Sequence, residues 1–87
     1  MKKYLATLSI LVTDRQANVA KVNSLLTQNG HLIMSRLGVN PSTACLTHCL
    51  GIIILVLSGE KTAIQKLATD LGQLRGIKTK LSVMLSE

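Results

Sequence analysis

The densest group of chemically reactive side chains lies between residues 45 and 49. Cys45, His48 and Cys49 bring two thiols and an imidazole together, and Zn²⁺ binds these groups in sets of four, or of three with a water molecule. The spacing is not that of a zinc finger, and the order Cys-x-x-His-Cys is not a haem attachment motif. Two interpretations stay open: a metal- or redox-sensing site, or a small buried Cys49 beside two loop residues.

The second histidine, His31, is the remaining candidate for a fourth ligand. If a hairpin joins the second and third apolar segments, facing residues have numbers that sum to about 88. That register predicts His31 opposite Leu57 and about 25–30 Å from His48, at about 3.3 Å per residue. Alternation along a strand also places His48 and Cys49 on opposite faces. A metal shared by both histidines would therefore need a second subunit.

Charged residues beside the apolar segments are further candidates for functional residues. Asp14 follows the first apolar segment, where its oxygens or those of Thr13 can cap the helix that comes next. Arg36 lies in an otherwise apolar segment and has two interpretations. It is either an edge-strand charge that discourages strand addition, or a contact to an anion or partner, which the forked guanidinium suits.

Length and composition predict one small domain over residues 1–87. Apolar residues make up 47% of the chain, yet Tyr4 is its only aromatic residue. The core must therefore be aliphatic, and a core of this size is only marginally stable. Two cysteines four residues apart give no disulfide framework, so we expect a homodimer or tetramer.

The remaining composition argues against several classes of function. The net charge is +6, but the basic residues are scattered and no aromatic side chains are interleaved to stack on bases. No helix-turn-helix or ribbon segment is recognisable, so direct nucleic-acid binding is not expected. There are four acidic residues, no nucleophile elbow and no glycine-rich loop before a helix. We therefore expect no catalysis.

The first twelve residues resemble a signal peptide, with Lys2 and Lys3 ahead of an apolar stretch. The stretch alternates, however, and Thr13-Asp14-Arg15 stands where a small-residue cleavage site belongs. We interpret it as a first strand. The protein is therefore expected to be cytoplasmic, without a membrane segment and with reduced thiols.

Apolar periodicity predicts strand–helix–strand twice. The expected elements are strands at about 3–12, 31–39, 47–59 and 77–85, a helix that ends at Asn29-Gly30, and a helix from about 58–60 to Arg75-Gly76. The two helical stripes repeat at a constant offset, with Val19, Val22 and Leu26 matching Ile64, Leu67 and Leu71.

Two such units joined by a hairpin give an α+β, ferredoxin-like βαββαβ sandwich, with a four-stranded antiparallel sheet and two helices on one face. The first and third strands are central in this arrangement. The run from Ile52 to Leu57 is apolar without a break, as expected for a strand that is buried on both faces. Nothing else in the chain can cover its second face, so we expect a partner copy on the open sheet face or at a sheet edge.

Three motifs carry a family resemblance over nearly the whole chain: Val12-Thr13-Asp14-Arg15, Ser35-Arg36-Leu37-Gly38 and Leu71-Gly72-Gln73-Leu74-Arg75-Gly76. They resemble the small proteins known as iron-only hydrogenase system regulators, a family related to ACT domains and to the C-terminal domain of nickel-responsive repressors. The resemblance implies an ACT-like regulatory and oligomerisation module. It would act in transcriptional or metabolic control linked to hydrogenase maturation.

The resemblance also implies a ligand site for a small-molecule effector. Asp14 and Arg15 would line a cleft between subunits, together with the strand end that carries Arg36 and Gly38. Amino-acid-binding ACT domains continue with Pro-Gly after the aspartate, where this chain has Gln16-Ala17. Nickel repressors carry histidines where this chain has Gly38 and Asn40, and a cysteine that Cys49 matches. No cofactor or effector is assigned.

Overall fold

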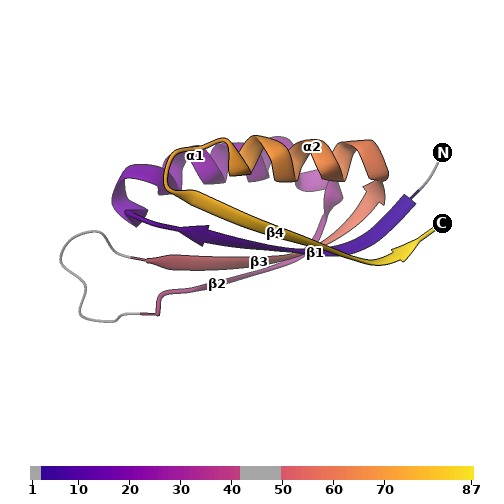
Figure 1. Ribbon diagram of the computed structural model, residues 1–87, viewed down its shortest axis with the longest axis horizontal. Coiled ribbons are helices and arrows are strands. Elements are labelled where there is room, and N and C mark those ends of the chain that lie inside the picture. The colour runs from indigo at the N-terminus through magenta and orange to yellow at the C-terminus, as the bar shows by residue number, and fades with distance from the viewer. Residues whose placement is uncertain (1–2, 42–49) are drawn as a thin grey trace.

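The computed structural model describes residues 3–41 and 50–87, without the side chain of Gln16. Its elements are β1 (Lys3–Val12), α1 (Arg15–Gln28), the short 3₁₀ helix η1 (Gly30–Leu32), β2 (Ile33–Val39), β3 (Gly51–Glu60), α2 (Lys61–Gly72) and β4 (Ile77–Ser86). The strands form one antiparallel sheet in the order β2-β3-β1-β4. Both helices lie on one face of this sheet, and within residues 3–41 and 50–87 no element covers the opposite face (Figure 1). The predicted ferredoxin-like sandwich, with the first and third strands at its centre, is confirmed.

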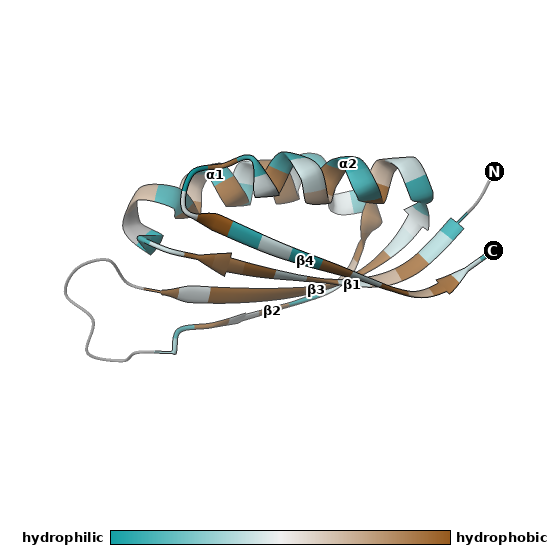
Figure 2. Cartoon of the chain, viewed as in Figure 1, coloured by the Kyte–Doolittle hydropathy of each residue, from teal (hydrophilic) through white to brown (hydrophobic). Residues whose placement is uncertain are grey.

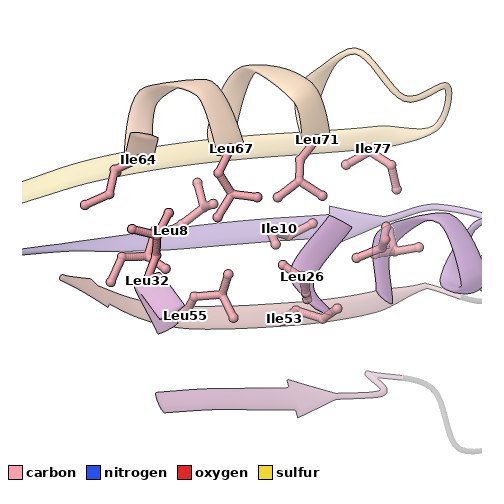
Figure 3. Close-up of a cluster of buried hydrophobic side chains, with 13 residues drawn as sticks. Leu8, Ile10, Leu26, Leu32, Ile53, Leu55, Ile64, Leu67, Leu71 and Ile77 are labelled. Atoms are coloured by element: carbon pink, nitrogen blue, oxygen red, sulfur yellow. The ribbon is translucent and has the colours of Figure 1, made fainter. Parts of the chain in front are cut away.

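The core lies between the helices and the sheet and is aliphatic, as the composition requires. Leu8 and Ile10 of β1 and Leu55 and Leu57 of β3 are fully buried against both helices. The predicted stripe of α2 supplies Ile64, Leu67 and Leu71, and α1 supplies Val22 and Leu26 (Figure 3). Burying each such side chain contributes about 1.5–3 kcal/mol, so the spacing of the two stripes fixes the faces on which the helices pack.

The stretch that resembles a signal peptide is the central strand β1. It pairs with β3 from Lys3 to Val12 and with β4 over nearly the same length. Its residues alternate between the buried helix side and the other face. Within the ranges that the structure describes, no helix has the length and apolar character needed to cross a membrane.

The predicted hairpin register between the second and third strands is wrong by three residues. Arg36 pairs with Leu55, and Val39 pairs with Ile52. Leu57 faces Ile33 rather than His31, which lies in η1. Paired residue numbers sum to 91 from Ser35 to Val39 and to 90 at Ile33, with a one-residue bulge between the two. The error therefore comes mainly from the turn position that the sequence analysis assumed, and not from the bulge. His48, whose predicted distance from His31 depended on this register, lies outside the described residues.

Element ends also differ from prediction. Gly30 does not adopt the left-handed conformation expected at the end of α1. The Asn29 side chain instead donates a 2.8 Å hydrogen bond to the carbonyl of Leu25. The strand β3 continues to Glu60, and α2 ends at Gly72, before the expected Arg75-Gly76. The left-handed glycine after α2 is Gly76, with φ 81°.

Candidate functional site

A cavity of about 150 Å³ lies between the start of α1 and the ends of β2 and β3. Three of the four residues predicted to bind a ligand line it: Arg15, Arg36 and Gly38. The rest of the lining is largely aliphatic and includes Val12, Val19, Val22 and Ile53. Val19, expected in the buried stripe of α1, is 38% exposed. The structure therefore gathers most of the predicted set around one small hollow, on the helix side of the sheet.

Arg15 is the first residue of α1 and is half-buried. Its aliphatic stem lies over the backbone of Gly51 in β3, because a Cβ at Gly51 would be 3.5 Å from Arg15 Cδ. Val12, at the end of β1, pairs with the same glycine. The arginine stem thus runs along the backbone of Gly51 at the mouth of the cavity.

Arg36 reaches the cavity from the edge strand β2. Its pairing with Leu55 places it on the helix side, and its Nη2 donates a 2.7 Å hydrogen bond to Oδ1 of Asn23 in α1. Among the residues that the structure describes, the one ion pair joins Lys66 to Asp70. Arg36 therefore has a fixed orientation without a carboxylate partner in that part of the chain. Its position on an edge strand agrees with the interpretation as a charge that discourages strand addition. Its position at the cavity agrees with the interpretation as an anion contact.

Gly38 leaves the cavity open on the strand side. It pairs with Ile53, a position that faces the helices, and a Cβ built there would meet no atom within 4 Å. Its backbone is not in the left-handed region. A larger residue at position 38 would therefore fit the strand and fill the hollow.

Asp14 does not line the cavity but sets the direction of the helix that carries Arg15. It occupies the N-cap position of α1 with φ 50° and ψ 66°, a left-handed conformation, which Asp tolerates better than most residues. Its carbonyl accepts hydrogen bonds from the amides of Ala17 and Asn18. The predicted cap by a side-chain oxygen is wrong, because the structure shows no side-chain capping bond on α1.

Three residues that the sequence analysis did not assign to the site hold this corner together. The Thr13 hydroxyl donates a 2.6 Å hydrogen bond to the carbonyl of Gly76, which also accepts the Thr13 amide at 2.8 Å. The buried Asn18 side chain donates to the Thr13 carbonyl at 2.7 Å. These bonds tie the end of β1 to the start of β4. Of these three residues, only Gly76 could be expected from the sequence, because a glycine often follows the end of a helix.

The predicted metal ligands Cys45, His48 and Cys49 lie outside the described residues. Over residues 3–41 and 50–87, no three His, Cys, Asp or Glu side chains gather in a way that could hold a metal ion. His31 is exposed in η1. The metal- or redox-sensing interpretation therefore stays a prediction from the sequence.

The fold is that of ACT domains. The solution structure of the ACT domain from GTP pyrophosphokinase of Chlorobium tepidum aligns with a TM-score of 0.66 over 91% of this chain and 85% of that one, at 12% identity. The C-terminal domain of the MgtC protein from Mycobacterium tuberculosis aligns at 0.63 over 92% and 87%, at 8% identity. At these identities the likeness establishes the architecture alone.

The sequence family is more specific than the fold. The model of the TM1266-like family, described as iron-only hydrogenase system regulators, matches residues 4–81, and the chain belongs to this family. The uncharacterized protein TM1266 from Thermotoga maritima is 31% identical, with a TM-score of 0.83 over 95% of this chain and 99% of that one. No curated protein sequence shows significant similarity. The resemblance drawn from the three motifs is confirmed.

Proposed function

We propose that this protein is a non-catalytic ACT-like regulatory module that assembles with copies of itself, in transcriptional or metabolic control linked to an iron-only hydrogenase system. The family description and the ACT-like fold support the regulatory role. The observation that carries the assembly is the sheet face opposite the helices, which no described element of the chain covers (Figure 1).

The half of this face formed by β2 and β3 is apolar. The register places Leu37 beside Ile54 and Val39 beside Ile52 on the side away from the helices. Leu37 is 59% exposed, Val39 46% and Ile54 39%, and both strands are mostly hydrophobic along their length (Figure 2). Covering each of these side chains would contribute about 1–2 kcal/mol. A contiguous apolar surface of this kind is typical of a protein–protein interface.

The half formed by β1 and β4 is polar and basic toward the start of β4, whereas Leu5 and Leu85 pair and are exposed at its other end. Ser9 pairs with Lys80 and Leu11 with Lys78 on this side of the sheet, and both lysines are exposed. Two copies stacked in full register would oppose like charges, in a chain whose net charge is +6. The arrangement we propose therefore overlaps the β2–β3 halves about a two-fold axis and leaves the lysines outside.

Light scattering coupled to size-exclusion chromatography at micromolar concentration tests this proposal. The wild-type chain is expected to be a dimer or tetramer, and Leu37→Lys is expected to be a folded monomer, because it places a charge in the apolar half. Ser82→Lys adds the same charge to the polar half of the same face and should keep the wild-type mass. A monomeric wild-type chain, or an oligomer unaffected by Leu37→Lys, would contradict the proposed interface.

A further inference from the structure

We propose that the cavity beside Arg15 and Arg36 binds a small aliphatic carboxylic acid that lacks an amino group. The inference rests on the proposed regulatory function, for which this acid would be the effector. Its carboxylate would lie between the two guanidinium groups, and its hydrocarbon chain would lie among the valine and isoleucine side chains.

The size and lining of the cavity determine the hydrocarbon chain of the proposed acid. An aliphatic cavity of about 150 Å³ in a protein admits a molecule such as benzene, with about six heavy atoms. The present cavity has about that volume, with Val12, Val19, Val22 and Ile53 in its lining. A branched chain of about four or five carbons would therefore fill it and exclude water from its surface.

The charged residues at the edge of the cavity determine the polar group of the proposed ligand. Arg15 approaches from the first turn of α1, where the helix dipole adds positive potential. Arg36 approaches from β2 and is oriented by Asn23. Neither guanidinium pairs with a carboxylate in the described part of the chain. Guanidinium groups bind carboxylates through two parallel hydrogen bonds, so the pair is suited to one anionic head group.

The same lining disfavours an amino acid. No Asp or Glu is among the described residues that line the cavity. The ammonium group of a bound amino acid would therefore lie beside two guanidinium groups and aliphatic side chains, where burial of an unpaired charge is costly. A 2-oxo acid or a simple fatty acid avoids this penalty. Free phosphate keeps the charge but leaves the aliphatic lining unfilled.

Calorimetric titration of the full chain with four probes tests the assignment. The probes are 4-methyl-2-oxopentanoate, 4-methylpentanoate, leucine and inorganic phosphate. We expect both acids to bind with one site per chain and leucine to bind at least tenfold more weakly. Leucine binding as tight as that of its 2-oxo acid would overturn the inference, as would binding of phosphate alone or of none of the probes.

Variants locate the site. Arg15→Gln and Arg36→Gln should each weaken binding of the acids at least tenfold, whereas Arg75→Gln, at an exposed position away from the cavity, should not. Gly38→Val should abolish binding and keep the fold, because its side chain enters open space and valine favours strands. Affinity unchanged in Gly38→Val would contradict the inference.

Light scattering on the same samples separates this inference from the proposed assembly. An oligomer that binds none of the acids would overturn the ligand assignment alone. A monomer that binds them through Arg15 and Arg36 would overturn the assembly and uphold the ligand site.

Discussion

Replacing Gly76 by alanine should destabilise the corner that positions Arg15. Gly76 has φ 81°, and a Cβ there would lie 2.7 Å from Thr13 Oγ1 and 3.0 Å from Asn18 Nδ2. The left-handed backbone costs a non-glycine residue about 1–2 kcal/mol. Thr13 can move away only by giving up its hydrogen bond to the Gly76 carbonyl, which contributes a further ~0.5–1.5 kcal/mol.

The two contributions together lower the free energy of unfolding by about 1.5–3.5 kcal/mol. For a domain of this size that is a fall in Tm of about 6–28 °C. Urea and thermal unfolding at one fixed protein concentration measure both quantities. Gly30→Ala is the matched control, because a Cβ there meets nothing within 4 Å and its backbone is not left-handed. A loss below about 0.5 kcal/mol in Gly76→Ala, the usual size of a neutral surface change, would refute the reasoning.

Three other predictions concern substitutions, two of them drawn from the structure and one from the sequence. Asp14→Val should lower the free energy of unfolding by about 1–2 kcal/mol in urea, because a β-branched residue resists φ 50°; a loss below about 0.5 kcal/mol would contradict this. Gly59→Ala should cost about 1–3 kcal/mol in thermal unfolding, because its Cβ would lie 2.5 Å from Leu32 Cδ2, and a wild-type Tm would count against it. If the cysteine–histidine cluster senses metal, the reduced protein should bind zinc by elemental analysis, and a Cys45→Ser, Cys49→Ser variant should not.

The architecture could be predicted because aliphatic periodicity is nearly complete in this chain. Ile64, Leu67 and Leu71 repeat the spacing of the first helix, and all three are buried. The unbroken, β-branched run from Ile52 to Leu57 favours a central strand. With one aromatic residue in the chain, most core positions follow from the spacing of aliphatic residues, although Val19 of the first predicted stripe is 38% exposed.

The geometry of the site could not be predicted in the same way. Arg36 faces α1 because a bulge after Ile33 shifts the later residues of β2 to the opposite face. In the sequence, Ile33, Leu37 and Val39 lie an even number of residues apart, as in a regular strand, so the bulge could not be recognised there. The contact between Thr13 and Gly76 joins residues 63 positions apart. The resemblance supplied Arg15, Arg36 and Gly38 as candidates, and only the folded chain placed them around one cavity.

In the proposed assembly, two copies meet through the β2–β3 half of the open sheet face. A filtered nuclear Overhauser experiment on a mixture of isotope-labelled and unlabelled protein tests it directly, because it detects only contacts between copies. The proposed interface should give intermolecular signals among the methyl groups of Leu37, Val39 and Ile54. Intermolecular signals confined to residues of β4 or the helices, in a sample that light scattering shows to be oligomeric, would contradict it.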